Sequence, residues 1–475
     1  MLAPIDYAVI AGYLAAITAF GSWFGRFQKT TRDYFLSGHS VPWWAVCCTV
    51  VATETSTLTF IGVPATAYAG NMTFLQLALG YVLGRLLVSA LFIPAYFRGD
   101  LVTSYELLQR RFGPRVTTLS AGLFLITRSL ADGIRLFATS LVISVVTGVP
   151  TAWATVIVGT IMIVYTVRGG SSAVIWTDVV QMFVYVAGAA AVAAALLGRI
   201  PGGWDEVVRT GAAAGKFAVL DLSTDPTVVY TLWTGLLGGV ALTLATHGTD
   251  QFLVQRLLAA TSLRAAASGL MLSGVIVFGQ FIVFLLIGVM LYTFHQHVPL
   301  TTALERTDQV LPHFVVNYLP SGMAGFIVAA IVAAALSPSL NAMAATTLND
   351  FYRPRRALAL DEAGLVALSR RITVGWGIVQ VGVALGAQFM DRSVLDAGLA
   401  VLSFASGSVL GAFLLATRAP SVGEREAFVG MVVGLAAMTL VWALTPTAWT
   451  WYVFIGAVTT VGTAWVLRRV APAGP

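Results

Sequence analysis

The chain has 475 residues, of which 58% are hydrophobic and only 10% are charged, and its formal net charge is +6. Soluble domains carry roughly 25% charged residues, so this composition excludes a soluble protein of this size. Apolar runs near the ~20 residues that cross a bilayer recur along the sequence, which predicts an all-α, polytopic membrane protein. The basic residues are spread over the loops between these runs, which argues against a nucleic-acid partner.

The apolar runs number about thirteen. The first has no basic residue ahead of it and is followed by Arg26, Lys29 and Arg32. It is therefore interpreted as a retained span with the N-terminus outside, and not as a signal peptide. The predicted spans are 5–25, 42–69, 74–97, 117–147, 151–167, 173–198, 229–254, 265–294, 321–349, 370–390, 394–417, 427–445 and 448–467.

Lysine and arginine are distributed unequally between the two sides of the predicted membrane. With the N-terminus outside, 19 of the 27 fall in inner loops, a count that includes Arg256, and five fall in outer loops. This asymmetry predicts an inner or plasma membrane protein with an outer N-terminus and a cytoplasmic C-terminus. The longest loop, 199–228, is then external, and 301–319 is expected to hold a short interfacial helix.

Two spans contain polar clusters where a membrane helix is expected to be apolar. Residues 52–57 read ATETST, and residues 246–250 read THGTD. Such clusters let a helix unwind where the freed backbone lines a cavity, and the alternative is a continuous helix whose hydroxyls bond back to the backbone. Each cluster opens a set of five spans, and because five is odd the second set starts on the opposite side. The pattern predicts an inverted-repeat transporter with a midplane site between two broken helices.

This arrangement divides the chain into five segments. They are a leading helix and inner loop (1–41), a first five-helix repeat (42–198), an external loop (199–228), a second five-helix repeat (229–417) and two trailing helices (418–475). The functional residues are expected in the two repeats.

Ionisable residues inside the predicted spans each cost about 2.5–3.5 kcal/mol if they stay unpaired. Arg128, Asp132 and Arg135 are spaced to share one helix face, either as a structural ion-pair ladder or as part of a substrate site. Glu54 and Arg85 lie on successive antiparallel spans and are expected to pair.

Three further positions leave two interpretations each. His247 stands one turn from Asp250 beside the second break, as a hydrogen-bonded core residue or a ligand. Asp178 lies near the inner end of the sixth span, as an interface residue or a cation ligand. In the ninth span Pro338 frees the carbonyl of Ala334, which is typical of a kinked packing helix or of an oxygen pocket for Na⁺.

Five segments carry a resemblance to a known family. They are DYFLSGHSVPWW (33–44), FIG (60–62), RGGSSAVIWTDVVQ (168–181), DQFLVQR (250–256) and SLNAMAATTLNDFY (339–352). In this order the sequence resembles the sodium/solute symporter family, which has a LeuT-like inverted-repeat fold, over nearly the whole chain. The resemblance implies a secondary active transporter that carries a small polar organic solute with Na⁺ by alternating access.

The resemblance also implies where Na⁺ binds. The implied sodium-binding residues are Ala52, Thr55, Ile331, Ala334 and Ala335, with Asp178 and Ser337 for a second ion. The family has hydroxyl side chains at two ninth-span positions where this chain has Ala334 and Ala335. Proton coupling, with Glu54 as the carrier, and Na⁺-independent transport on the same fold are the alternatives. Na⁺ is the only metal or cofactor expected.

The substrate candidates come partly from the resemblance. The substrate-binding candidates are Thr59, Gln76, Tyr81, His247 and Asp250, and the candidate charge network is Glu54, Arg85, Arg128, Asp132 and Arg135. The family's sugar-contacting positions are not all matched, so the solute is not expected to bind as in the family's sugar carriers. Arg85, Arg135 and Gln76 are instead candidates to attract an anionic or polyhydroxy solute, such as a carboxylate or a sugar. A non-transporting receptor and a membrane enzyme are the competing classes. The chain shows no catalytic motif, so it is not expected to be an enzyme, and no obligatory protein partner is evident.

Overall fold

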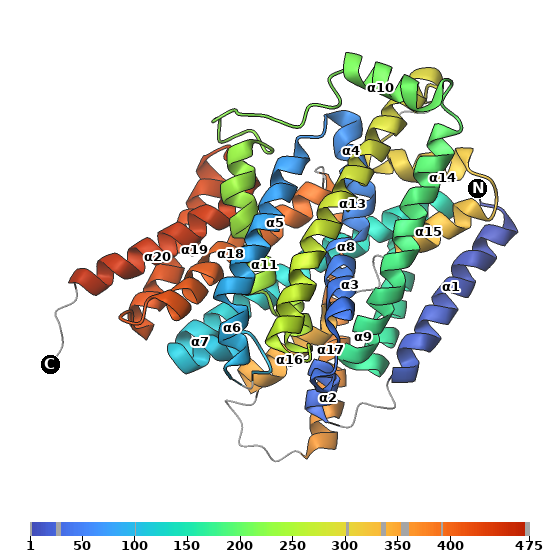
Figure 1. Ribbon diagram of the computed structural model, residues 1–475. Helices are drawn as coiled ribbons and strands as arrows, with labels where there is room; N and C mark the ends of the chain where they lie inside the picture. Colours follow the sequence, from blue (N-terminus) through green and yellow to red (C-terminus); the bar gives the residue numbers. More distant parts are fainter. Residues whose placement is uncertain are drawn as a thin grey trace.

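The computed structural model describes residues 2–24, 30–99, 101–300, 304–333, 339–352, 361–390 and 393–470. Within these ranges every regular element is a helix, apart from one isolated bridge (Figure 1). The helices are α1 (Pro4–Trp23), α2 (Thr31–Leu36), η2 (Ser37–His39), α3 (Trp43–Glu54), α4 (Thr57–Ala69), α5 (Phe74–Leu91), α6 (Ile93–Phe97), α7 (Tyr105–Arg111), α8 (Pro114–Thr147), α9 (Thr151–Leu197), α10 (Gly203–Ala213), η3 (Thr234–Gly239), α11 (Val240–Gly248), α12 (Gln251–Leu258), α13 (Leu263–His297), η4 (Thr307–Gln309), α14 (Val310–Tyr318), α15 (Met323–Ala333), α16 (Leu340–Thr346), η5 (Thr347–Tyr352), α17 (Glu362–Ala387), α18 (Val394–Arg418), α19 (Glu424–Leu444), η6 (Trp449–Trp451) and α20 (Tyr452–Val470).

The predicted all-helical membrane fold is confirmed, and the count of thirteen spans stays a prediction. In the described ranges eight helices are long and apolar enough to cross a membrane, and the bent pair α3–α4 makes a ninth. The other predicted spans fall on the first part of α9, on η3 to α12, on α15 to η5 and on α17. Within the described residues these segments are helical, but their helices are shorter, interrupted or less apolar. The predicted helix within 301–319 is confirmed as α14.

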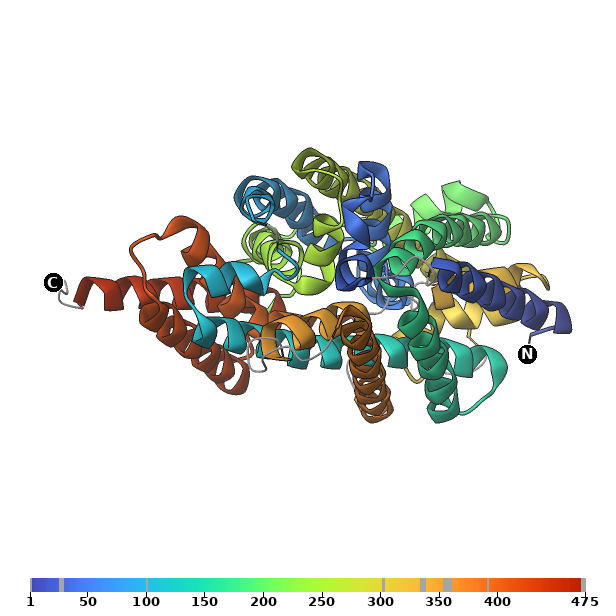
Figure 2. The same cartoon turned by 90° about the horizontal axis from the view of Figure 1, so that it is seen from below.

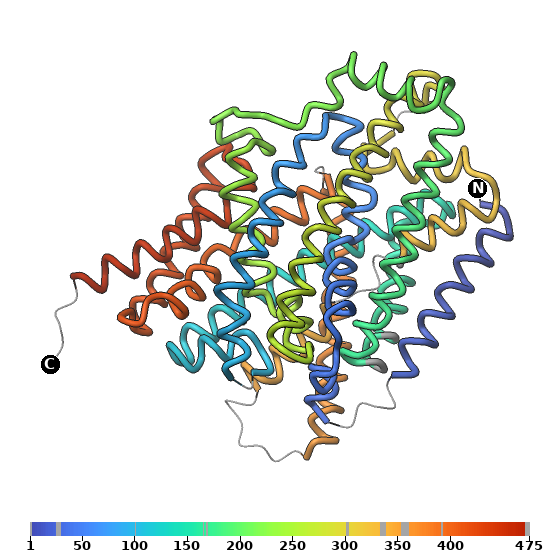
Figure 3. The backbone as a smooth tube through the Cα atoms, viewed as in Figure 1, coloured from blue at the N-terminus to red at the C-terminus, as the bar shows by residue number. Residues whose placement is uncertain are grey.

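Both predicted helix breaks are present. The first lies at Thr55 and Ser56, where α3 meets α4 at a bend of 59°. The second lies at Thr249 and Asp250, between α11 and α12. Short polar side chains occupy both breaks, so the backbone can leave the helical conformation there without steric hindrance from bulky side chains. Figure 3 follows the chain through both turns.

One glycine separates the predicted fifth and sixth spans. Gly170 lies within α9 at φ 59° and ψ −162°, a conformation that residues with a Cβ rarely adopt. The helix is therefore kinked there, and the segment after the kink, Gly170–Leu197, is one of the apolar helices long enough to cross a membrane.

The helices outside the two repeats lie at opposite edges of the molecule. Helix α1 packs against α9 and α15 at one edge, while α19 and α20 pack on each other and on α18 at the other (Figures 1 and 2). Buried Asp6 fastens α1, because its Oδ1 accepts hydrogen bonds from the amides of Gly322 and Gly325, at 2.6 and 2.8 Å. This matches the predicted arrangement of one leading and two trailing helices.

Glycines bring α5 against the second broken span. A Cβ at Gly80 would clash with the carbonyl of Gly235, and one at Gly84 would clash with the side chain of Thr243. Helices approach this closely only where small residues face each other. The close packing places Arg85, the next residue along α5, beside His247 on α11.

A short bridge joins the two broken spans at one end. The amide of Val41 donates to the carbonyl of Ala259, and the amide of Thr261 donates to the carbonyl of Val41, both at 3.1 Å. The Nδ1 of His39 adds a 2.6 Å contact to the carbonyl of Leu258. The segment that leads into α3 is therefore bonded directly to the segment that follows α12.

Candidate functional site

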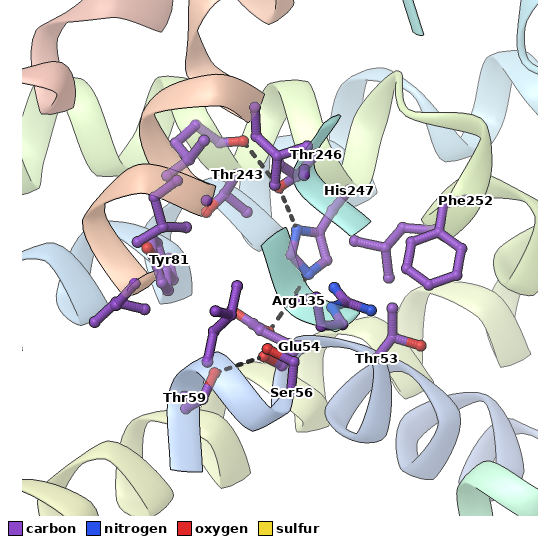
Figure 4. Close-up of a pocket in the computed structure, with 18 of the residues that line it drawn as sticks. Thr53, Glu54, Ser56, Thr59, Tyr81, Arg135, Thr243, Thr246, His247 and Phe252 are labelled. Carbon is purple, nitrogen blue, oxygen red and sulfur yellow. Dashed lines mark hydrogen bonds and ion pairs between the residues drawn. The ribbon is translucent and has the colours of Figure 1, made fainter. Parts of the chain in front are cut away.

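A buried cavity of about 110 Å³ lies between the two helix breaks (Figure 4). Polar residues from α3, α4 and α11 face it on one side, and apolar residues from α13 and α18 face it on the other. Its lining residues are Thr53, Glu54, Ser56, Leu58, Thr59, Phe74, Tyr81, Arg128, Ala131, Arg135, Leu242, Thr243, Thr246, His247, Phe252, Leu253, Phe281, Leu395, Gly398, Leu399 and Leu402. Mostly apolar walls with a few convergent polar groups are typical of a small-molecule site.

The first break releases two backbone carbonyls. The amide of Ser56 donates to the carbonyl of Glu54 at 3.0 Å, and the amide of Thr59 donates to that of Ser56 at 2.9 Å. In a continuous helix these amides would serve the carbonyls of Ala52 and Thr55, four residues earlier. The carbonyls of the first two predicted sodium-binding residues have therefore lost their helical donors. Oxygen atoms of this kind suit a hard cation.

A third predicted sodium-binding residue lies beside the start of α4. The carbonyl of buried Ile331 accepts a hydrogen bond from the Oγ1 of Thr57 at 3.0 Å, and Thr57 also accepts one from Thr139 at 2.9 Å. The predicted residues Ala334, Ala335 and Ser337 lie outside the described residues.

The predicted pair of Glu54 and Arg85 is confirmed. The Nη2 of Arg85 donates to the Oε2 of Glu54, and its Nη1 donates to the carbonyl of Tyr81 at 3.0 Å. The Nε2 of His247 lies 3.6 Å from the same carboxylate oxygen, and its Nδ1 lies 2.9 Å from the hydroxyl of Thr246. Arg85 is fully buried, and this pairing offsets the cost of placing its charge there.

The predicted ladder on α8 is also confirmed and reaches the second break. Asp132 lies 3.6 Å from Arg128 and 3.8 Å from Arg135. Arg128 in addition forms an ion pair with Asp250, whose other oxygen caps α12 by accepting the amide of Phe252 at 2.9 Å. The second break is therefore closed by a side-chain cap and an ion pair.

The ring of Phe252 connects these charges. The guanidinium carbons of Arg128, Arg135 and Arg256 lie 4.7, 5.8 and 4.3 Å from its centroid. A buried aromatic face of this kind stabilises a cation through the ring quadrupole. Phe252 could not be identified from the sequence as part of the site, because a single aromatic residue carries no signal of its own.

One assignment from the sequence was wrong. Arg256 was counted among the inner-loop residues, but it lies in α12, is buried, and pairs with Asp178 at 3.2 Å. Its Nε also donates to the hydroxyl of Thr49 at 3.1 Å, and that hydroxyl donates to Asp178. Removing Arg256 leaves 18 arginine and lysine residues in the predicted inner loops, so the asymmetry behind the predicted orientation persists.

The five predicted substrate residues do not all meet. Thr59, Tyr81 and His247 line the cavity, and Asp250 lies behind it in the ion pair with Arg128. Gln76 is not among the lining residues. Its amide group donates to the carbonyl of Tyr230 at 3.3 Å, and its oxygen accepts the amide of Asp221 at 3.1 Å, so it holds the segment that precedes the second broken span.

The lining also contains residues that the sequence did not single out. Thr243 faces the cavity from α11, and Leu395 and Gly398 face it from α18. Threonine, leucine and glycine are common in every membrane span, so their presence in the sequence does not indicate a site. Only the packing of α18 beside the two breaks shows that these residues line the cavity.

Two discontinuous helices that meet at a polar cavity inside a membrane-spanning bundle define the class of inverted-repeat secondary transporters. The profile of the Sodium:solute symporter family matches residues 34–434. The human sodium/iodide cotransporter is 30% identical over 446 residues, which cover 91% of this chain and 68% of that protein. The sodium/sialic acid symporter SiaT of Proteus mirabilis is 29% identical over 449 residues, which cover 91% of this chain and 88% of SiaT.

Solved structures agree with the sequence matches. A substrate-bound, outward-open Na⁺-coupled sialic acid symporter superposes with a TM-score of 0.91 at 27% identity, covering 99% of this chain and 98% of that one. Mhp1, a nucleobase-cation-symport-1 family transporter, superposes with a TM-score of 0.63 at 14% identity, covering 93% and 96%, and so shares the fold. The chain belongs to the sodium:solute symporter family, and the predicted LeuT-like fold is confirmed.

Proposed function

We propose that this protein is a secondary active symporter that couples Na⁺ to the transport of a small organic anion by alternating access. The relatives support both Na⁺ as the coupling ion and a negatively charged solute. They include a sodium/iodide cotransporter, a sodium-coupled monocarboxylate transporter and a sodium/sialic acid symporter. Iodide is an anion, and monocarboxylates and sialic acid carry a carboxylate. The family consists of transporters, which also argues against the enzyme and receptor alternatives.

The balance of charge around the cavity favours an anion carried together with a cation. Three arginines (Arg85, Arg128 and Arg135) and three carboxylates (Glu54, Asp132 and Asp250) form the described network. With neutral His247 their formal charges cancel. An isolated charge is costly in a low-dielectric interior. One Na⁺ and one monovalent anion would together leave the balance unchanged, whereas a sugar with Na⁺ would add a net positive charge.

The position of Arg135 is the observation that favours an anionic solute. Its side chain lines the cavity, is 12% exposed, and shares the carboxylate of Asp132 with Arg128. A guanidinium on the wall of a buried cavity binds a carboxylate through two parallel hydrogen bonds better than it binds a neutral hydroxyl. In this proposal Thr59, Tyr81 and His247 contact the rest of the solute.

The proposed sodium site lies at the first break. It uses the carbonyls of Ala52, Thr55 and Ile331, with Ala334 and Ala335 at the positions where the family has hydroxyls. The break supports this assignment, because it frees two of these carbonyls from the helical ladder. At the second position that the resemblance implies, Asp178 with Ser337, the guanidinium of Arg256 lies 3.2 Å from the carboxylate and already supplies its cation, so the proposal places a single Na⁺ at the first break.

Uptake into proteoliposomes tests the proposal. Labelled monocarboxylates, sugar acids and matched neutral sugars are offered with a Na⁺ gradient and a pH gradient imposed separately. We expect Na⁺-driven uptake of an acid, and we expect Arg135→Gln to raise its KM by about tenfold or more, since a charge-assisted pair is lost. Arg209→Gln removes an exposed arginine far from the cavity and is the matched control.

Two outcomes would contradict the proposal. Uptake of a neutral sugar with no acid transported would overturn the anionic substrate. Uptake driven by a pH gradient alone, without a response to Na⁺, would support proton coupling through Glu54 instead. The proposed location is an inner or plasma membrane with the N-terminus outside, which labelling of single cysteines at the two ends of the chain would test.

A further inference from the structure

A second cavity lies far from the transport site. It measures about 420 Å³ and opens between α6, α7 and α18. Figure 1 shows α6 and α7 at the end of the molecule opposite α10. The residues that line this cavity are Ala90, Leu91, Pro94, Ala95, Arg98, Gly99, Leu101, Leu107, Arg110, Ala416, Thr417 and Arg418.

Three exposed arginines converge on this cavity from three different helices. Arg98 directly follows α6, Arg110 lies in the last turn of α7, and Arg418 is the last residue of α18. Among the described lining residues these are the only charged ones, and most of the others are apolar. The cavity thus combines a positively charged end with an apolar wall.

Helix termini explain each arginine singly but not their convergence. A cation in the last turn of a helix interacts favourably with the negative end of its dipole. The dipole interaction does not require the three arginines to line the same cavity, so it does not explain why they lie together. Glu106 lies 3.9 Å from Arg110 with both side chains partly exposed, so this ion pair is weak.

The walls of the cavity are held in place by another arginine. The Nη2 of Arg111 donates to the carbonyls of Ala419, Pro420 and Val422 at 3.2, 2.7 and 2.8 Å. These bonds fasten the end of α7 to the turn that follows α18. Gly99 contributes too, because the guanidinium of Arg110 occupies the space that a Cβ there would need.

The cavity lies where two apolar spans end. Phe74–Phe97 and Val394–Arg418 are both long and apolar enough to cross a membrane, and each ends at a cavity arginine or directly before one. Arginine in this position lies at the level of lipid phosphates, and basic pockets between helices on the cytoplasmic side bind anionic head groups.

We propose that this cavity binds the phosphate of an anionic phospholipid, with its glycerol and first acyl carbons against Leu91, Pro94 and Leu107. A phosphate diester accepts hydrogen bonds from several guanidinium groups at once. The bound lipid would connect α6 and α7 to α18, a helix whose other end lines the transport cavity through Leu395 and Gly398. Lipid composition would in this way act on the transporter from a site that the solute does not touch.

Native mass spectrometry and melting of the purified full-length protein test this proposal. The protein in detergent receives phosphatidylglycerol, phosphatidylcholine or inorganic phosphate at equal concentration. The test variant is Arg98→Gln/Arg110→Gln/Arg418→Gln. The control, Arg264→Gln/Arg468→Gln/Arg469→Gln, removes the same charge from exposed sites outside the cavity. We expect the wild type and the control to retain phosphatidylglycerol, and the test variant to bind it about tenfold or more weakly.

Each remaining outcome would overturn the proposal. Equal weakening in the control would reduce the effect to overall charge, and unchanged binding in the test variant would exclude the cavity. Stabilisation by inorganic phosphate to the same degree would assign the site to a free anion. If the triple variant does not fold, the single variants Arg110→Gln and Arg418→Gln replace it, and each is expected to weaken phosphatidylglycerol binding by several-fold.

Discussion

The two breaks occupy equivalent places in the two repeats but are built differently. At the first break the N-cap residue of α4, Ser56, makes no side-chain capping hydrogen bond, and the carbonyls of Ala52 and Thr55 lose their helical donors. At the second break Asp250 caps α12 and pairs with Arg128. An uncapped break offers oxygen atoms to a cation, while a capped and ion-paired break holds its own structure. The repeat thus fixes where the chain unwinds, and local side chains decide what the unwound segment can bind.

The largest effect is expected from opening the ion pair at the second break. Arg128→Met leaves the buried carboxylates of Asp250 and Asp132 without this partner, which should destabilise the protein by about 3–5 kcal/mol. The melting temperature in detergent measures it. Thr53→Val at the first break should cost about 1 kcal/mol or less, because that hydroxyl bonds back within its own helix. Equal losses in both variants would show that the two breaks do not differ in this way.

The next largest effect, on ion-driven uptake, is expected from Glu54, whose carboxylate at the first break faces His247 near the second. Glu54→Gln keeps the shape of the side chain but removes the charge that faces Arg85 and His247. We expect ion-driven uptake to fall by about tenfold or more, since a buried cation loses its partner. Uptake is measured over a range of pH with Na⁺ present or absent. Ion dependence that is unchanged at every pH would exclude a role for Glu54 in coupling.

A smaller effect should separate the breaks by their response to Na⁺. Thr57→Val removes the hydrogen bond to the carbonyl of Ile331 and so loosens one side of the proposed sodium site. The Na⁺ concentration for half-maximal uptake should rise several-fold, which corresponds to about 1 kcal/mol. Thr249→Val at the second break is the matched control and should leave that concentration unchanged, because its hydroxyl donates to the carbonyl of Ala245 in α11 and does not line the cavity. A shift in the control alone would move the sodium site to the second break.

The smallest effect is expected at the C-terminal end of α4. Lys216 donates to the carbonyls of Tyr68 and Gly70 at 2.6 and 2.9 Å, and burial lowers the pKa of its ammonium group. Because the folded protein then releases this proton at lower pH than the unfolded chain, stability should rise slightly as the pH increases through the lowered pKa. Lys216→Met should lose about 1 kcal/mol and should lose that slope. Melting curves between neutral and alkaline pH compare the two proteins, and an identical slope in both would exclude Lys216 as its source.

The sequence predicted the fold better than it predicted the contents of the site. Both breaks and the ion pairs around Glu54 and Asp132 could be predicted from polar residues in apolar runs, because an unpaired charge inside a membrane span is energetically costly. The pairing of Arg256 with Asp178 could not be foreseen, because a basic residue near a span end is typical of a loop. Gln76 has the right chemistry for a ligand but faces a loop, and Phe252 has no distinguishing pattern. Such positions depend on how distant helices pack, which one sequence does not encode locally.

The bridge between Val41 and Ala260 has a consequence for how the protein can move. Since the segment before α3 is bonded to the segment after α12, neither half-helix can swing away from the other without breaking backbone hydrogen bonds. Movement of either half-helix would therefore be passed to the other through these backbone hydrogen bonds. Coupling between the two breaks through this attachment would need no relay of side chains.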